Sequence, residues 1–234
     1  MTDAYDYLIV GGGSAGCVLA NRLSADPACR VGLVEAGGDD RRAVIGVPAG
    51  FAAMLPLPWH NYAYRTVPQP GLGGRRGYQP RGRVLGGSSS TNAMVYVRGQ
   101  AEDYAAWVAA GADGWSYAEV LPYYRKAEDN ERGADAYHGV GGPLHVADLR
   151  SPSPINQRFV EAVRMLGYPA NPDFNGARQE GAGLYQVTQK NGERWSAARG
   201  YLHPALARSN LEVRTGTKTL RLILEGERAT GIEV

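Results

Sequence analysis

Cysteine, long apolar runs and excess charge of either sign are all scarce in this chain of 234 residues. The two cysteines, Cys17 and Cys29, form no CxxC pair, so their spacing indicates neither a zinc site nor a disulfide framework. No apolar run approaches the roughly 18 residues of a membrane span, and the first predicted strand begins too early to leave room for a signal peptide. We therefore expect a cytoplasmic protein without a transmembrane segment, with attachment to a membrane surface as the alternative.

Charge is nearly balanced, with 25 Lys and Arg against 23 Asp and Glu and a net charge of +2. This balance does not indicate a nucleic-acid surface. The four histidines, His60, His138, His145 and His203, share no ligand spacing. We therefore predict structural or exposed histidines, no metal site and no Ser-His-Asp constellation.

The N-terminal segment carries a dinucleotide fingerprint. The apolar run 6–10 is typical of a strand buried on both faces, and it leads directly into Gly11-Gly12-Gly13-Ser14-Ala15-Gly16. In this G-x-G-x-x-G pattern Gly11 makes the tight turn, Gly13 lets the backbone approach a pyrophosphate, and Gly16 lets helix and strand pack closely. The diphosphate would then lie at the N-terminus of a helix that extends to about Ser24.

A second predicted strand, 30–35, ends in Glu35, whose carboxylate is well placed to accept hydrogen bonds from a ribose diol. Strand, glycines, helix, strand and terminal acid together predict dinucleotide binding. One alternative is a tight turn that binds nothing. Another is the G-x-S-x-G nucleophile elbow of α/β-hydrolases, which the same letters match. The position of Ser14 disfavours the elbow, because a hydrolase needs strands and an oxyanion loop upstream of its serine.

The rest of the chain is rich in loops. Residues 37–80 contain many Gly and Pro and predict an extended arm over the surface. We predict helices at 101–110, at 116–128 after a Ser116–Glu119 capping box, at 155–166 with Phe159 and Leu166 on one face, and at 196–208 interrupted by Pro204. Short strands at 211–215, 219–224 and 229–234 predict a small antiparallel meander attached to the nucleotide-binding sheet.

A second glycine-rich loop decides the class of dinucleotide. Gly86 and Gly87 are followed by the four hydroxyl residues 88–91, and Asn92 adds an amide that can donate and accept. Such a loop suits a polar ring system as well as a diphosphate. It argues against the remaining alternative, an NAD-binding Rossmann protein.

At these loops the chain resembles the glucose–methanol–choline (GMC) oxidoreductases, flavoproteins that oxidise alcohols, and within them the choline-dehydrogenase-like bacterial branch. The likeness runs from Tyr5 to Val234 almost without a gap. The stretches that carry it are Tyr5-Asp6-Tyr7, Glu35-Ala36-Gly37, Pro68-Gln69-Pro70-Gly71, Gly86-Gly87-Ser88-Ser89, Gly111-Ala112-Asp113-Gly114-Trp115-Ser116-Tyr117, Tyr137-His138-Gly139, Gly142-Pro143-Leu144, Asp173-Phe174-Asn175-Gly176 and Arg194 through Leu202.

The resemblance implies FAD as the cofactor and assigns residues to it. The expected FAD contacts are Gly11, Gly13, Ser14, Ala15 and Gly16 at the diphosphate, Glu35 and Ala36 at the ribose, Val84, Gly87, Ser88, Asn92, Ala93, Met94 and Val95 along the diphosphate and isoalloxazine, and Thr219 at adenine through its backbone. Some family members have a histidine at the position of Thr91 that links covalently to the flavin. Threonine cannot form that bond, so we expect dissociable FAD.

The implied fold is α/β: a Rossmann-like FAD-binding sheet with an attached antiparallel meander and helical or loop insertions. We expect all of 1–234 to form an N-terminal FAD-binding region, divided into a βαβ fingerprint (1–36), an arm with the second FAD loop (37–100), an insertion (101–195) and a helix with returning strands (196–234). Family members are more than twice this length. Their substrate domain and catalytic histidine correspond to no residue here.

The implied reaction is oxidation of a small-molecule alcohol to an aldehyde or ketone by hydride transfer to flavin N5, in the whole enzyme. The alternative is a catalytically inactive FAD-binding fragment or degenerate homologue. The substrate and the electron acceptor, oxygen or a quinone, stay open.

Overall fold

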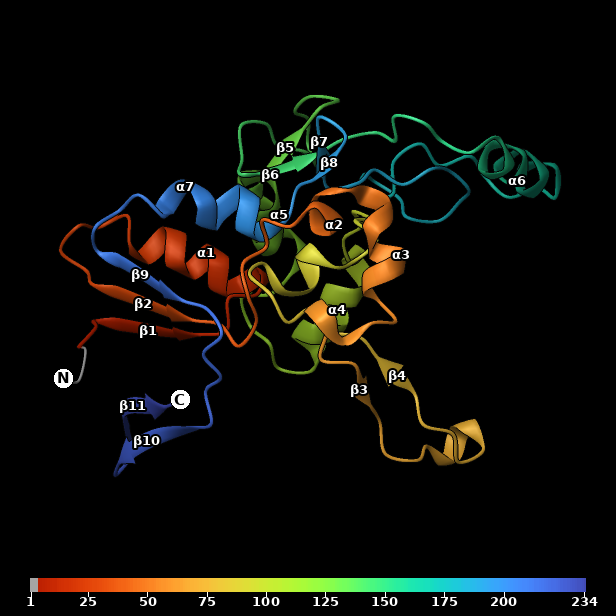
Figure 1. Ribbon diagram of the computed structural model, residues 1–234. Helices are drawn as coiled ribbons and strands as arrows, with labels where there is room; N and C mark the ends of the chain where they lie inside the picture. Colours follow the sequence, from red (N-terminus) through yellow and green to blue (C-terminus); the bar gives the residue numbers. More distant parts are fainter. Residues whose placement is uncertain (1–3) are drawn as a thin grey trace. The chain divides into compact units, whose positions relative to one another are not determined.

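The computed structural model describes residues 4–234, so the first three residues of the expected 1–36 segment lie outside it. The described chain forms two compact units (Figure 1). The first contains the residues up to Ala93 together with Glu193–Val234. The second is Met94–Gly192, which contains most of the expected insertion.

The first unit is built on a three-stranded parallel sheet in the order β1-β2-β9. Its strands are β1 (Tyr7–Val10), β2 (Val31–Val34) and β9 (Leu211–Arg214). Helix α1 (Ser14–Leu23) follows the glycine fingerprint, and its buried side chains pack with β2 and with the turn Ala198–Leu202 in one apolar core. The predicted α/β class with a Rossmann-like sheet is thus confirmed.

Strand β1 differs from the prediction of burial on both faces. Only Ile9 is buried, whereas Tyr7, Leu8 and Val10 are exposed. The reason is its position: β1 is an edge strand of the described sheet, and Ile9 alone joins the core that contains Cys17 of α1. An apolar run by itself does not distinguish an edge strand from a central one.

The predicted three-stranded meander is also wrong in one strand. Residues 211–214 form β9, which pairs in parallel with β2, and only β10 (Arg221–Glu225) and β11 (Arg228–Glu233) form an antiparallel hairpin. A parallel strand needs a crossover connection, which here is helical. A π-helical turn and α7 (His203–Ala205) precede β9 and pack on α1.

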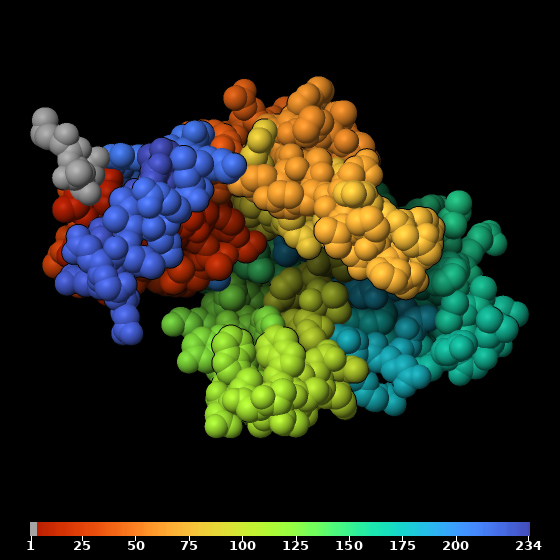
Figure 2. Space-filling model, turned by 90° about the horizontal axis from the view of Figure 1, so that it is seen from below, coloured from red at the N-terminus to blue at the C-terminus, as the bar shows by residue number. Residues whose placement is uncertain are grey.

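The predicted arm 37–80 has short elements of its own. These are α2 (Ala43–Gly46), α3 (Phe51–Met54), 3-10 turns at Pro48–Gly50, Pro58–His60 and Pro70–Leu72, and the strands β3 (Tyr64–Arg65) and β4 (Tyr78–Gln79). A 3-10 turn at Gly87–Ser90 and β8 (Glu193–Arg194) complete the unit. Strands β3 and β4 pair antiparallel, and segment 61–80, light orange in the space-filling view, lies at the surface (Figure 2).

The second unit contains the helices α4 (Ala101–Ala109), α5 (Tyr117–Ala127) and α6 (Pro154–Met165), and the strands β5 (Glu128–Asn130), β6 (Leu144–Val146) and β7 (Gln189–Lys190). The predicted capping box is confirmed: the Ser116 N–H donates to Glu119 Oε2 at 2.9 Å, and the Glu119 N–H donates back to Ser116 Oγ at 3.4 Å. Strand β5 begins directly after α5 and pairs in parallel with β6.

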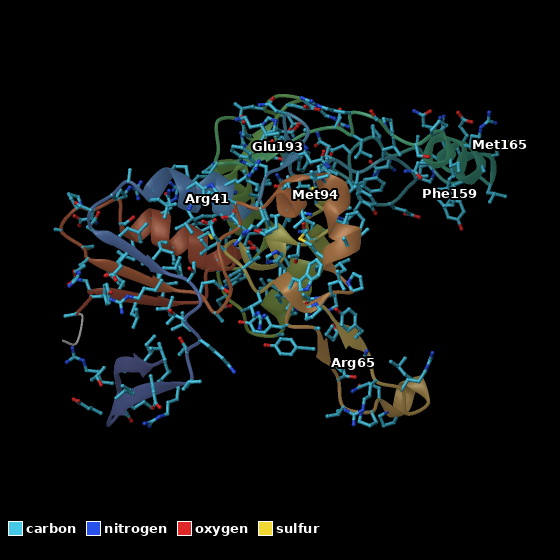
Figure 3. The ribbon with its side chains drawn as sticks, viewed as in Figure 1. Arg41, Arg65, Met94, Phe159, Met165 and Glu193 are labelled. Carbon is cyan, nitrogen blue, oxygen red and sulfur yellow. The ribbon has the colours of Figure 1, made fainter. Side chains whose placement is uncertain are left out.

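Helix α6 lies within one residue of its predicted limits, but its apolar side chains are exposed. Phe159 is 67% exposed and Leu166 77% exposed, and no residue of the helix is buried. Figure 3 shows Phe159 and Met165 on this helix. None of the helices in residues 4–234 has both the length and the apolar character needed to cross a bilayer.

The close packing of strand and helix at Gly16 gives the first prediction. A Cβ at Gly16 would lie 2.0 Å from the carbonyl oxygen of Gly11. We therefore expect Gly16→Ala to lower the free energy of unfolding by about 1–3 kcal/mol, the usual cost of overpacking. The control is Gly71→Ala, where a Cβ meets no atom within 4 Å. Urea unfolding of both variants checks this, and equal stability of the two would contradict it.

Candidate dinucleotide site

The glycine fingerprint adopts the backbone conformation that its pattern predicts. Gly11 has φ of +94°, in the left-handed region that favours glycine. Gly13 is the N-cap of α1, and no side chain caps the helix there. A Cβ at Gly13 would meet no atom within 4 Å, and Ser14 and Ala15 after it are exposed. An open helix N-terminus of this kind attracts anionic groups, because its first N–H groups have no partner within the helix.

The second glycine loop packs directly on the first. A Cβ at Gly87 would lie 2.8 Å from the Cα of Gly13, and the N–H of Gly86 donates to the carbonyl of Gly12 at 2.7 Å. Gly86 and Gly87 both have positive φ, +84° and +55°. The tertiary structure therefore brings together two loops that lie about seventy residues apart in the sequence.

The loop uses two of its hydroxyls internally. Ser89 Oγ donates to the carbonyl of Gly86 at 2.6 Å, and the fully buried Ser90 donates to that of Leu85 at 2.7 Å. Thr91 is buried as well, whereas Ser88 is exposed and accepts from the Gly82 N–H at 3.1 Å. The expectation of four hydroxyl donors for a ligand is thus wrong for Ser89 and Ser90. The tight turn leaves carbonyl groups that these hydroxyls satisfy.

Glu35 connects the loops at the carboxyl edge of the sheet. Its buried carboxylate accepts from the N–H groups of Gly12 at 2.8 Å and Gly37 at 2.7 Å. Its own N–H donates to the carbonyl of Arg214, and its carbonyl accepts from Thr217. Each carboxylate oxygen has a further lone pair, so these bonds are compatible with a ribose hydroxyl as an additional donor.

Arg194 is a functional candidate that sequence reasoning missed. Its side chain is almost completely buried below the second loop, where Nη1 donates to the Ser89 carbonyl at 3.2 Å and to Asn92 Oδ1 at 2.9 Å, and Nε donates to Ile45. Within residues 4–234 no carboxylate pairs with it, and Nη2 has no hydrogen-bond partner. Burial lowers the pKa of Arg194 to about 10. In the sequence Arg194 begins one of the stretches that carry the family resemblance, but no spacing or charge pattern there assigns it to a cofactor.

The other predicted contacts of the first unit vary in exposure. The side chain of Val84 is fully buried against Ile45 and Met54, so only its main chain is available to a ligand. Asn92 and Ala93 are exposed and Ala36 is half-buried. Thr219 is half-buried as a residue, and in the described chain its Oγ1 is buried without a hydrogen-bond partner.

Two predicted contacts, Met94 and Val95, belong to the second unit. Met94 is buried with φ of +62°, and its carbonyl accepts from the Thr188 N–H at 2.9 Å. Val95 is 48% exposed and pairs with Val187 in an isolated antiparallel bridge. Met94 is therefore held in a left-handed conformation that is unusual for a residue other than glycine.

Three of the four histidines are held by carboxylates, and they lie at separate places. His203 contacts Asp40 at 2.9 Å in the first unit, and His145 contacts Asp129 at 2.8 Å in the second. His138 lies between Glu128 and Asp173. In the part of the chain that the structure describes, no group of His, Cys, Asp and Glu side chains could hold a metal ion.

The residues of the first unit fit an anionic dinucleotide. The helix N-terminus at Gly13 supplies N–H donors with open space in front of them, and the buried guanidinium of Arg194 lies under the adjoining loop without a compensating carboxylate. Burying a cation without its counter-charge is costly, so this arrangement favours a negative group at the site. The carboxylate of Glu35 supplies an acceptor at the strand end.

Comparison with known proteins agrees with this geometry. The family described as GMC oxidoreductase matches residues 5–234. Human mitochondrial choline dehydrogenase is 51% identical over 99% of the chain, which spans 40% of that enzyme's length.

Two solved structures share the fold. Pyridoxine 4-oxidase from Mesorbium loti superposes with a TM-score of 0.92 and 39% identity, over 98% of this chain and 45% of that one. An FAD-dependent oxidoreductase from Chaetomium thermophilum superposes with a TM-score of 0.88 and 28% identity, over 98% and 41%. The chain thus spans less than half the length of the relatives it matches. Because the family match covers all but four residues, the chain belongs to the GMC oxidoreductase family.

Proposed function

We propose that this chain is the FAD-binding part of an enzyme that oxidises a small alcohol to an aldehyde or ketone. The observation that carries the proposal is the direct packing of the loop at Gly87 on the fingerprint at Gly13, with the buried Arg194 below it. A single fingerprint would accommodate many dinucleotides. The second loop and its cation fit a longer anionic cofactor with a polar ring, and a solved relative is an FAD-dependent oxidoreductase.

In this proposal each part of the site has a defined role. The N–H groups at Ser14 and Ala15 hold the diphosphate, while Glu35 orients the ribose and fixes the glycine turn at the same time. Arg194 holds the second loop in shape through Ser89 and Asn92. The positive charge of Arg194 also attracts the negative groups of the ligand to the site.

FAD, when bound, would accept the hydride that the alcohol carbon loses. The substrate class follows from relatives that act on choline and pyridoxine, both of which carry alcohol groups. The second candidate is an FAD-binding protein without catalysis, which is favoured for this part of the chain because three of its four histidines, His138, His145 and His203, are each held by a carboxylate. The electron acceptor is oxygen in an oxidase and a quinone in a dehydrogenase. Measuring oxygen consumption during turnover distinguishes the two.

The first test concerns the attachment of the flavin. Thr91 is buried and has no ring nitrogen, so we expect FAD to bind without a covalent bond. Acid precipitation of the FAD-loaded protein should release all yellow colour into the supernatant. Flavin that stays in the pellet after repeated washing would contradict the proposal, and free FAD carried through the same steps gives the baseline.

The second test removes one charge from the strand end. Glu35→Gln replaces an acceptor of two main-chain N–H groups and of the proposed ribose bond by an amide. A hydrogen bond to a charged group is worth about 1.5–3 kcal/mol, so FAD affinity should fall about 10- to 100-fold. Quenching of flavin fluorescence measures the dissociation constant.

The control for this variant is Glu212→Gln on the neighbouring strand β9, where the carboxylate contacts Arg214 and Tyr5 instead. Thermal unfolding without FAD separates a loss of binding from a loss of stability. An unchanged dissociation constant for Glu35→Gln would reduce Glu35 to a residue that only shapes the turn.

The third test asks what residues 1–234 do alone. His138, His145 and His203 each contact a carboxylate, and His60 has a pKa lowered by burial and by the nearby Arg42 and Arg83. We expect no oxidation of primary alcohols when the chain is supplied with FAD and an artificial acceptor. Human choline dehydrogenase with choline is the positive control. Turnover above the free-flavin background would direct attention to His60.

A further inference from the structure

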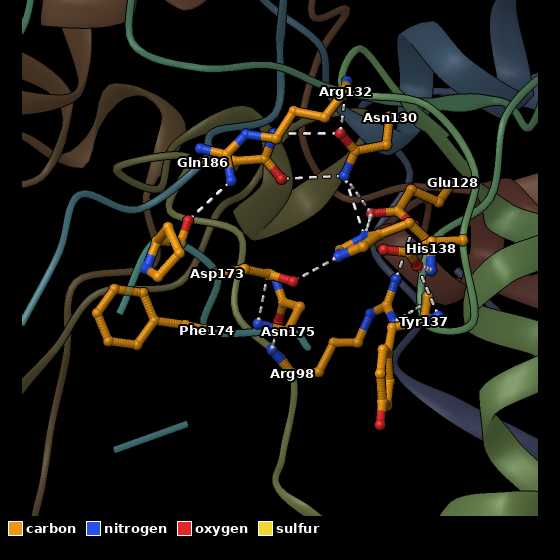
Figure 4. Close-up of polar contacts among 12 residues, drawn as sticks. Arg98, Glu128, Asn130, Arg132, Tyr137, His138, Asp173, Phe174, Asn175 and Gln186 are labelled. Atoms are coloured by element: carbon orange, nitrogen blue, oxygen red, sulfur yellow. Dashed lines mark hydrogen bonds and ion pairs between the residues drawn. The ribbon is translucent and has the colours of Figure 1, made fainter. Parts of the chain in front are cut away.

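A buried ionic cluster lies in the second unit (Figure 4). Arg98 and Glu128 form an ion pair, with Nη2 and Oε2 2.8 Å apart and side chains that are 1% and 0% exposed. His138, 6% exposed, lies against the same carboxylate, with Nδ1 3.0 Å from Glu128 Oε1. Its other ring nitrogen, Nε2, is 3.0 Å from Asp173 Oδ2.

The neighbours of His138 determine its protonation. An ionised carboxylate only accepts hydrogen bonds, so both ring nitrogens must carry a proton to bond to Glu128 and Asp173. Asn130 Nδ2 also lies 3.1 Å from Nδ1, but its two protons are directed to Glu128 Oε1 at 3.0 Å and Gln186 Oε1 at 2.9 Å. Nδ1 is thus a donor, and the ring is an imidazolium.

The charges of the groups that contact Glu128 and His138 sum to zero when His138 is protonated. Arg98 contributes one positive charge, and Arg125 contributes another where its Nε donates to the His138 carbonyl. The three negative groups are Glu128, Asp173 and Asp135, which accepts from the His138 N–H. Arg98 and Glu128 compensate each other in the buried part of the cluster, and Arg125 and Asp135 are exposed. A protonated His138 therefore serves chiefly as the counter-charge of Asp173, whose side chain is 29% exposed.

The cluster fixes the segment that follows Met94 and Val95. The N–H of Arg98 donates to Asn175 Oδ1 at 2.7 Å, and Asn175 Nδ2 donates to the Tyr96 carbonyl at 3.1 Å. From the other side, the Tyr96 N–H donates to the Gln186 carbonyl at 2.9 Å. The side chain of Gln186 is bonded in both directions to Asn130, beside His138.

We propose that protonated His138 is a positioning residue, which holds the chain directly after Met94 and Val95 in place by joining Glu128 to Asp173. This inference rests on the proposed function, in which Met94 and Val95 lie along the flavin. His138 touches neither cofactor nor substrate in this proposal. It acts indirectly, because its ring joins strand β5, which carries Glu128, to the loop that carries Asp173. Asn175 of that loop bonds to the main chain of Tyr96 and Arg98.

The proposal has a pH consequence with a definite sign. The hydrogen bond to Glu128 raises the pKa of His138, against the opposing effect of burial. The stabilisation is therefore complete below the unfolded pKa of histidine, about 6.5, and is lost as pH rises through the raised folded value. Burial alone would raise the pKa of Glu128, but bonds from His138 and Gly139 and the charge of Arg98 lower it overall, so its contribution is lost in acid.

The experiment combines nitrogen NMR with flavin binding in the protein that carries this chain. In protein labelled with ¹⁵N-histidine, His138, assigned by its loss in His138→Gln, should show two protonated ring nitrogens at pH 7.5. A single protonated nitrogen would overturn the proposal, and this measurement does not need FAD. His145→Gln is the matched control, because His145 has one carboxylate contact in the same unit.

In the second measurement His138→Gln should weaken FAD binding about tenfold or more and shift the flavin absorption band, whereas His145→Gln should change neither. Wild-type affinity should fall as pH rises through the His138 pKa, and His138→Gln should lack that dependence. If His138→Gln does not fold, Asp173→Asn, at a partly exposed position, replaces it. Unchanged affinity and spectrum in a folded variant would overturn the inference, whereas wild-type protein that binds no FAD would instead overturn the proposed function.

Discussion

The contact between the two glycine loops is the constraint on which the rest of the first unit depends. Gly87 can approach Gly13 because Gly87 has no side chain: a Cβ there would lie 2.8 Å from the Cα of Gly13. The hydrogen bond from Gly86 to Gly12 fixes the register of the two loops. Glu35 then ties the fingerprint to the neighbouring strand ends through main-chain N–H groups. The site is therefore built largely from backbone, and its geometry changes little with the identity of exposed side chains.

Buried charge is handled differently in the two units. In the first, Arg194 is buried with main-chain and amide acceptors and without a carboxylate, which leaves a positive field below the second loop. In the second, Arg98 and His138 are paired with the two carboxylates of Glu128 and Asp173. An unbalanced charge suits a place where a ligand brings the opposite sign, and a balanced one suits a place that only holds shape.

Two errors of the sequence interpretation have separate physical causes. A short apolar run predicts a strand but not its place in the sheet, so the exposure of Tyr7 and Val10 on an edge strand was missed. Hydroxyl side chains near glycines were assigned to the ligand, although Ser89 and Ser90 satisfy the carbonyls of their own turn. The exposure of β1 depends on distant chain, whereas Ser89 and Ser90 bond to carbonyl groups three and five residues away in their own turn.

The sequence alone determined the strand-glycine-helix order, the acid at the end of β2, the second loop and the capping box at Ser116, because these depend on residues within a few positions of one another. Only the tertiary structure placed Gly87 on Gly13, residue 211 beside β2, and Arg194 below Ser89. It also joined His138 to Asp173, which lie in two separate loops. Each of these contacts joins residues more than thirty positions apart, where no periodic pattern connects the partners and packing alone selects them.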